Sequence, residues 1–193
     1  MINIKGLKKS MSLPINMIIV VAIGFTLLIL AIFWIKNFFG GLTQQTTEIN
    51  RITQQAISSL SIEDPNAKFY LSKDMLTLSR GKVEPIAYYV QNFDNSDQQF
   101  YMAIQCVRST SDPNFAKNCN PDDWFLKYMT TVTIKAKDIY KDALVVTAPK
   151  GTTPGNYVFN LYICKGSYSG SKAPTSCENG ELYDQKTLIV EVK

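Results

Sequence analysis

The sequence predicts an α+β protein, in which a long N-terminal transmembrane helix with an amphipathic extension precedes an all-β sandwich. Residues 15–35 carry no charge, residues 49–60 repeat apolar side chains every three or four positions, and residues 67–193 alternate in short runs. The predicted parts are a basic leader at 1–10, the transmembrane helix at 11–42, an amphipathic stalk helix at 43–66 and the β domain at 67–193.

The apolar run starts at Ile15, and Met17–Ile35 alone has 19 residues. At about 1.5 Å per residue this helix would be roughly 28 Å long, close to the ~30 Å hydrocarbon core of a bilayer. A cleaved secretory signal peptide is the alternative, but its apolar region is usually shorter, about 7–15 residues. We therefore expect a retained single-pass anchor with membrane lipid as its partner.

The net charge of +4 comes from the membrane flanks. Residues 1–42 contain no Asp or Glu and four lysines: Lys5, Lys8, Lys9 and Lys36. The 20 basic residues less these four leave 16, which equals the 16 acidic residues, so the rest of the chain is neutral. Three lysines before the helix predict a cytoplasmic N-terminus and an extracellular C-terminal domain. Nucleic acid is not an expected partner, because no basic patch is left to bind it.

The chain contains no histidine, which excludes Ser-His-Asp triads, Cys-His dyads and histidine metal sites. We expect no enzymatic activity and no cofactor. One loop could ligate calcium, but its spacing matches no EF-hand and a solvated loop is favoured. Its polar residues are Asp112, Asn114, Asn118, Asn120, Asp122 and Asp123. An aromatic group that includes Trp124, Phe125 and Tyr128 could form an exposed binding patch, although core packing is favoured.

The stalk has one narrow apolar stripe on a helix rich in Gln, Thr and Ser. The stripe consists of Ile49, Ile52, Ala56 and Leu60. Three turns are marginal in water, so the stripe must pack on the following domain or on neighbouring copies, and the first is favoured. We expect Gly40-Gly41 to loosen or bend the helix and Asp64-Pro65-Asn66 to end it.

Residues 67–193 contain short alternating runs between turn signals, which predict antiparallel strands. The expected strands are 69–78, 86–91, 100–107, 132–134, 144–148, 157–164 and 188–192, with a further piece around 124–128. Seven or eight short strands fit a two-sheet sandwich, and a barrel is the less favoured alternative.

The four cysteines form two pairs with equal spacing. Cys106 and Cys119 are 13 residues apart, as are Cys164 and Cys177, which suggests two local disulfides in an oxidising compartment. The alternative is one bridge from Cys106 to Cys164. In the strand from Tyr157, however, the odd-numbered residues are apolar, so Cys164 would point away from their face. Local pairing is therefore favoured.

Lys8-Lys9-Ser10, followed by Met11 to Asn16, resembles the start of archaeal type IV pilin-like proteins. The resemblance implies a class III signal peptide cut between Ser10 and Met11 by a leader peptidase on the cytoplasmic side. It also implies self-association through the helix. The candidate assembly residues are Ile15, Met17, Ile49, Ile52 and Leu60. The alternative is an uncleaved single-pass anchor.

Three runs resemble the opening strands of immunoglobulin-like surface domains: Leu76–Lys82, Ile86–Asn92 and Phe100–Ile104. The stretch Ala148–Tyr157 resembles the turn before their penultimate strand. This resemblance implies an immunoglobulin-like fold and no particular activity. The resulting function hypothesis is a pilin-like subunit of an extracellular filament; the alternative is a membrane-anchored adhesion or accessory binding protein.

Overall fold

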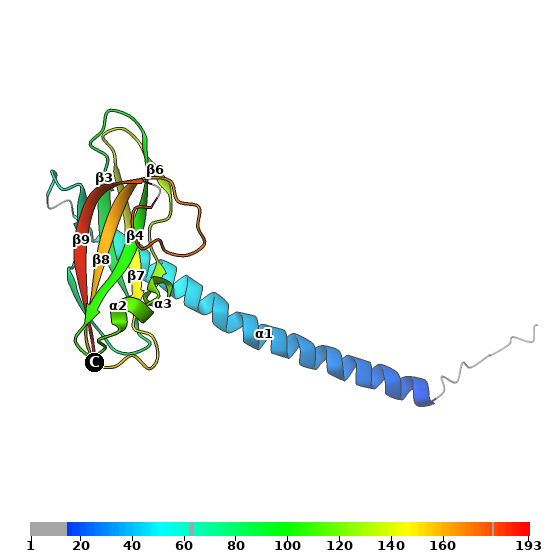
Figure 1. Cartoon of the computed structure of the whole chain (residues 1–193). Coiled ribbons are helices and arrows are strands. Elements are labelled where there is room, and N and C mark those ends of the chain that lie inside the picture. Colours follow the sequence, from blue (N-terminus) through cyan, green and yellow to red (C-terminus); the bar gives the residue numbers. More distant parts are fainter. Residues whose placement is uncertain (1–14, 62–63, 179) are drawn as a thin grey trace, which may run out of the picture. The chain divides into compact units, whose positions relative to one another are not determined.

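The computed structural model describes residues 15–61, 64–178 and 180–193. Its first element is one long helix, α1 (Ile15–Ser58), shown in blue and cyan in Figure 1. The chain divides into two compact units, Met1–Thr47 and Glu48–Lys193. The last part of α1 therefore belongs to the same unit as the β domain. The proposed cleavage site, Ser10 and Met11, lies outside the described residues.

Two sheets make up the β domain, as the alternating pattern predicts. The four-stranded sheet has the order β1 (Phe69–Leu71), β3 (Val83–Gln91), β7 (Ile139–Thr147) and β5 (Phe125–Lys127). The five-stranded sheet has the order β2 (Met75–Leu78), β9 (Gly180–Val192), β8 (Gly155–Gly166), β4 (Gln98–Ser109) and β6 (Val132–Ile134). Figure 1 shows β9, β8 and β4 side by side. The short helices α2 (Phe115–Asn118) and α3 (Pro121–Trp124) lie between β4 and β5 in sequence.

The expected antiparallel pairing is wrong at one place, because β2 and β9 are parallel. The expected single strand 69–78 is also wrong, since it is divided into β1 and β2, which belong to different sheets. The Ser72 amide donates to the Ala87 carbonyl (2.8 Å) beside β1, and the Ile189 amide donates to the Asp74 carbonyl (2.9 Å) beside β2. Three consecutive polar residues, 72–74, interrupt the alternation at this crossing.

Strand β9 begins at Gly180, well before the expected start at 188. Its first half is mostly polar and exposed, so it carries no burial period, yet it pairs with β8 along its length. Pro85 lies within β3, where β7 pairs on one side and the short β1 reaches only residues 88–90 on the other. Proline is tolerated at position 85 because β1 does not reach it, so the edge of β3 that faces away from β7 has no ladder hydrogen bond to lose at this residue.

The main core lies between the sheets and follows the strand period. In β8, Tyr157, Phe159, Leu161 and Ile163 are buried on the inner face. At one end, Phe159 contacts the rings of Phe115 (5.5 Å between centroids), Trp124 (5.2 Å) and Phe125 (5.1 Å). Burying aromatic rings of this size contributes on the order of 1.5–3 kcal/mol each, before entropy is counted.

The helix α1 continues through Gly40-Gly41 and ends at Ser58, before the expected stop at Asp64-Pro65-Asn66. Two serine hydroxyls bond back to carbonyls of the last turn: Ser58 Oγ to Gln55 O (2.9 Å) and Ser59 Oγ to Ala56 O (2.8 Å). Serine side chains compete in this way with the helical ladder, which accounts for the earlier end.

Candidate functional site

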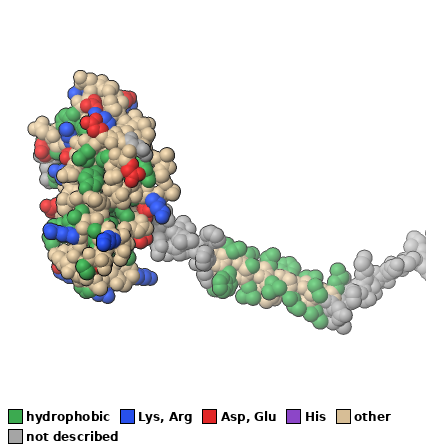
Figure 2. Space-filling model, viewed as in Figure 1, with side chains coloured by type: hydrophobic (Ala, Val, Ile, Leu, Met, Phe, Trp, Pro, Cys, Tyr) green, Lys and Arg blue, Asp and Glu red, His purple; other side chains and the backbone are tan. Residues whose placement is uncertain are grey.

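The first candidate site is the apolar segment Met17–Ile35 of α1. Its mean hydropathy is 3.0, and it is long and apolar enough to cross a membrane. Every large apolar side chain in it is at least half-exposed, from 50% for Ile19 to 73% for Trp34. Figure 2 shows this segment covered with hydrophobic side chains and without acidic or basic ones on the visible face. Met17 is 54% exposed, and Ile15 is the first residue of α1.

The segment satisfies its own polar groups. The hydroxyl of Thr26 donates to the carbonyl of Ala22 (2.8 Å), one turn earlier in the same helix. The backbone amides and carbonyls of a helix interior are likewise paired within the helix. A segment of this kind needs nothing from water, which is the condition for residence in lipid or in a dry helix bundle.

The end of α1 packs on its own β domain. Leu60, which follows the helix, is 8% exposed and clusters with Ala87 and Tyr89 on the outer face of the four-stranded sheet. Ala56 packs beside them. This is the intramolecular packing favoured for the stalk stripe. It leaves Leu60 little surface for a second copy, which argues against the assembly role predicted for that residue.

Two other residues of the stripe keep more of their surface. Ile49 and Ile52 are half-buried, so both retain area that a neighbouring chain could cover. Thr53, which lies in sequence between Ile52 and the residues that pack on the sheet, Ala56 and Leu60, is 4% exposed. Among the predicted assembly residues, Met17, Ile49 and Ile52 therefore present accessible apolar surface in the described structure.

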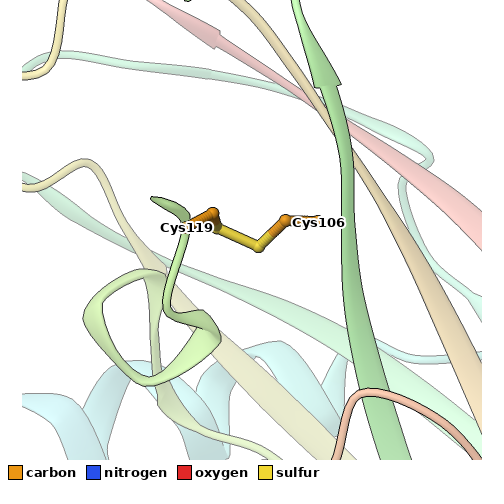
Figure 3. The surroundings of a disulfide bond; sticks show 2 residues. All are labelled: Cys106 and Cys119. Atoms are coloured by element: carbon orange, nitrogen blue, oxygen red, sulfur yellow. A yellow bond between two sulfur atoms is a disulfide. The ribbon is translucent and has the colours of Figure 1, made fainter. Parts of the chain in front are cut away.

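The structure contains both local disulfides that the spacing predicts. Cys106 is bonded to Cys119 and Cys164 to Cys177, with Cα–Cα distances of 6.2 and 5.5 Å. Figure 3 shows the first bond joining β4 to the chain that follows α2. Cys106 belongs to the main core, whereas Cys164 clusters with Tyr101 and Ala103 on the opposite face of the same sheet. The parity argument is therefore confirmed.

The segment 167–178, between β8 and β9, folds over this opposite face. Tyr168 stacks on Tyr101 at 5.7 Å, and its amide and carbonyl both bond to the hydroxyl of Thr131 (2.8 Å each). The Pro174 carbonyl accepts from the Ile104 amide at 2.7 Å, which covers the free side of β4 beyond β6. Covering a strand edge in this way protects it from pairing with another chain.

Asp122 connects the two disulfide-bonded regions. Its Oδ1 atom accepts from the Ala173 amide (3.0 Å) and from the Tyr128 hydroxyl (3.3 Å). Burial, followed by the nearby Asp122 carboxylate, raises the pKa of Tyr128 to about 12. The sequence gives no signal for this role, because Asp122 and Asp123 are adjacent and only the folded loop distinguishes them.

The calcium hypothesis finds no support in the described parts of the chain, where no cluster of three or more acidic, histidine or cysteine side chains could hold a metal ion. Asp122 bonds as above, and Asp112 accepts from the Asn114 amide (2.9 Å). The aromatic group is divided between core and rim. Trp124 (5% exposed) and Phe125 (1%) are core residues, as expected, and Tyr128 packs at the edge of that core.

A partly buried charge pair lies on the four-stranded sheet. Lys127 of β5 contacts Asp142 of β7 at 2.5 Å, and the Tyr140 hydroxyl donates to the other carboxylate oxygen at 3.1 Å. Burial, with a smaller contribution from Asp142, raises the pKa of Tyr140 to about 12. The Lys127–Asp142 contact joins neighbouring strands, β5 and β7, and is a structural pair.

No protein-family model matches the chain, and no curated protein sequence matches it. Several solved structures share a distant likeness. The ASH/PapD-like domain of human CEP192 is 10% identical, covers 70% of this chain and 91% of its own, and has a TM-score of 0.41. WR4, an MSP family member of C. elegans, is 8% identical with coverage of 66% and 100% and a TM-score of 0.38. The E. coli chaperone DraB is 10% identical with coverage of 65% and 54% and a TM-score of 0.37. Likeness at this level carries no argument about function.

Proposed function

We propose that this chain is a non-enzymatic, pilin-like structural subunit of an extracellular filament. The observation that carries the proposal is the exposed apolar segment Met17–Ile35, attached to a disulfide-bonded β domain. Full burial of an apolar side chain of this size is favourable by on the order of 1.5–3 kcal/mol, and this free energy is not gained while the side chain remains in water. In the proposal the helix is first stored in the membrane, with the N-terminus in the cytoplasm and the β domain outside. It is then buried against copies of itself.

The resemblance of Lys8–Asn16 to archaeal pilin-like leaders supports removal of residues 1–10 by a leader peptidase. The order of the strands and the turn before Tyr157 support an immunoglobulin-like topology for the β domain. Because lipid is already apolar, transfer from bilayer to filament recovers little hydrophobic free energy. Assembly therefore depends on close helix packing or on an external motor.

A second candidate is a single-pass anchored ectodomain that binds a partner from the cell surface. The observation that favours it is that Glu48–Lys193 forms a compact unit with its own core. Such a domain needs no second copy to fold. In this alternative the apolar helix stays in lipid and residues 1–10 remain on the chain.

Mass spectrometry of the mature N-terminus separates the two candidates. The filament proposal predicts a chain that begins at Met11, and a chain that begins at Met1 contradicts it. Electron microscopy of material shed from the cell surface then shows whether filaments carry the subunit.

A matched pair of variants tests the assembly helix itself. Leu28 and Leu126 are 56% and 51% exposed, one in the apolar segment and one on β5. We expect Leu28→Lys to abolish filaments, since a lysine in an apolar layer costs about 3 kcal/mol on insertion scales. Leu126→Lys places the same charge on the surface of the β domain and should leave filament yield unchanged. Filaments of normal length from Leu28→Lys would refute the proposal.

A further inference from the structure

A cleft of about 410 Å³ opens at one end of the sandwich, where α2 and α3 meet the turn between β7 and β8. Figure 1 shows both short helices near the same end of the sheets as that turn. None of the residues that line the cleft belongs to the apolar helix. Its lining combines buried aromatic rings with the polar side chains of Asn118, Asn120 and Asp123.

The floor of the cleft is made of three aromatic rings that contact one another. Phe115 meets Trp124 and Tyr157 edge to face, at 5.7 and 5.0 Å between ring centroids, and Trp124 lies 4.7 Å from Tyr157. Each of the three residues is at least 95% buried, so the floor is apolar and closely packed and exposes only a small area of ring. The Tyr157 hydroxyl is fixed by the Thr153 carbonyl at 2.7 Å.

The walls combine donors and acceptors without a positive charge. No lysine or arginine lines the cleft, whereas two acidic residues, Asp112 and Asp123, do line it. In the described structure, the side chains of Asn118, Asn120 and Asp123 make no hydrogen bond to the protein. Asn120, which precedes α3, makes no side-chain cap bond to that helix. These three side chains are free to bond a ligand.

The wall that carries both asparagines is held in place before any ligand arrives. The disulfide from Cys119 to Cys106 lies between them in sequence, and the Cys119 amide donates to the Phe115 carbonyl at 2.8 Å. At the start of the same loop, the Asp112 carboxylate accepts a hydrogen bond from the Asn114 amide (2.9 Å). A preformed wall lowers the entropy cost of binding.

These features select one class of ligand. Two carboxylates with no basic residue in the lining disfavour the binding of an anion. Two acidic side chains are also too few for a dedicated cation site, and no larger cluster of candidate metal ligands occurs among the described residues. Amide, hydroxyl and carboxylate groups above an apolar floor suit a molecule with many hydroxyls and apolar C–H edges, and the cleft has the volume of a small-molecule site. We propose that the cleft binds a neutral carbohydrate.

The test uses the full chain in a polyoxyethylene detergent, because a detergent with a sugar headgroup would compete for the site. The probe is an array of neutral and sialylated oligosaccharides, followed by titration calorimetry with the neutral trisaccharide that binds best. We expect Asn118→Ala combined with Asn120→Ala to weaken binding at least about tenfold, since each amide supplies hydrogen bonds to the ligand. Asn114→Ala is the matched control, because Asn114 is in the same loop but does not line the cleft.

The control should bind within about twofold of the native chain, and thermal unfolding should show that both variants remain folded. Filament formation should be normal in both, so failure of this proposal is distinct from failure of the assembly proposal. The carbohydrate site is refuted if no neutral oligosaccharide binds. It is equally refuted if the sialylated ones bind better, or if the double variant binds as well as the native chain.

Discussion

The apolar segment of α1 and the core of the β domain are similarly hydrophobic but are treated in opposite ways. Met17–Ile35 exposes at least half of each large apolar side chain, whereas Tyr88, Met102 and Phe159 in the β domain are completely buried. In the strands, one side chain in two is apolar and faces the other sheet. In Met17–Ile35 no face of the helix is polar, so no orientation on a small domain could bury every face of this segment.

The comparison shows that hydrophobicity and self-sufficiency are separate properties of a segment. The β domain supplies the partners for its own apolar groups and adds two disulfides. The helix satisfies only its polar groups, as the Thr26–Ala22 hydrogen bond illustrates. We propose that its apolar surface is completed by lipid or by copies of the same helix.

The largest contrast should come from one substitution made in both regions. Phe159→Ala removes a ring that contacts Phe115, Trp124 and Phe125, and should destabilise the β domain by about 3–5 kcal/mol. Phe25→Ala, at a position 65% exposed, should leave the unfolding of that domain unchanged. Thermal unfolding of both chains in detergent, followed by near-UV circular dichroism, measures the difference. Equal losses would show that the helix is part of the domain's core.

The disulfides sharpen the same contrast, because both lie in the self-sufficient region. Replacing Cys106 and Cys119 by Ala should lower the free energy of unfolding by about 3 kcal/mol, since each bond closes a short loop in the unfolded chain. The Cys164–Cys177 pair, with the same separation of 13 residues, should cost a similar amount. Denaturant unfolding measures both, and membrane association should be unaffected. Non-reduced peptide mapping that found Cys106 joined to Cys164 would contradict the pairing.

Within the unit Glu48–Lys193, the packing of the stalk on the sheet should respond to Leu60. Because Leu60 packs on Ala87 and Tyr89, Leu60→Ala should free the end of the stalk at a cost of about 2 kcal/mol. Hydrogen exchange of residues 49–60 should accelerate while β3 stays protected. Gln54→Ala, on the exposed side of the same helix, is the control and should change neither.

The smallest expected effect is at high pH and is confined to the β domain. The pKa of Tyr140 is raised to about 12, mainly by burial, so the folded state keeps a proton that an unfolded tyrosine releases near pH 10. Stability present below pH 10 should therefore fall as the pH rises from 10 to 12. Tyr140→Phe should flatten this decline, measured as the denaturation midpoint against pH. An unchanged slope would show that Tyr140 does not contribute, whereas the segment 17–35 has no group that titrates in this range.

The sequence was sufficient for the features that follow a period or a spacing. The apolar run gave the position of the membrane-length helix, and the alternation in 157–164 gave both the core face and the orientation of Cys164. The equal separation of the cysteines gave the disulfide pairing. Each of these is a local property that one stretch of chain carries by itself.

The features that were missed depend on segments far apart in sequence. The first half of β9 is mostly polar and exposed, and is a strand because β8 pairs with it. The switch of sheet between β1 and β2 is set by contacts to Ala87 and Ile189. The bond from Asp122 to Ala173 joins two loops that no spacing relates. Long-range pairing of this kind leaves no periodic signal.

Sedimentation of the full chain after removal of detergent and lipid tests the central claim most directly. The account predicts that no monomer of 21.7 kDa remains in solution, and that the material is filamentous, aggregated or bound to added vesicles. A dissolved 21.7 kDa monomer with a folded β domain and intact disulfides would contradict it, because the apolar helix would then be stable in water.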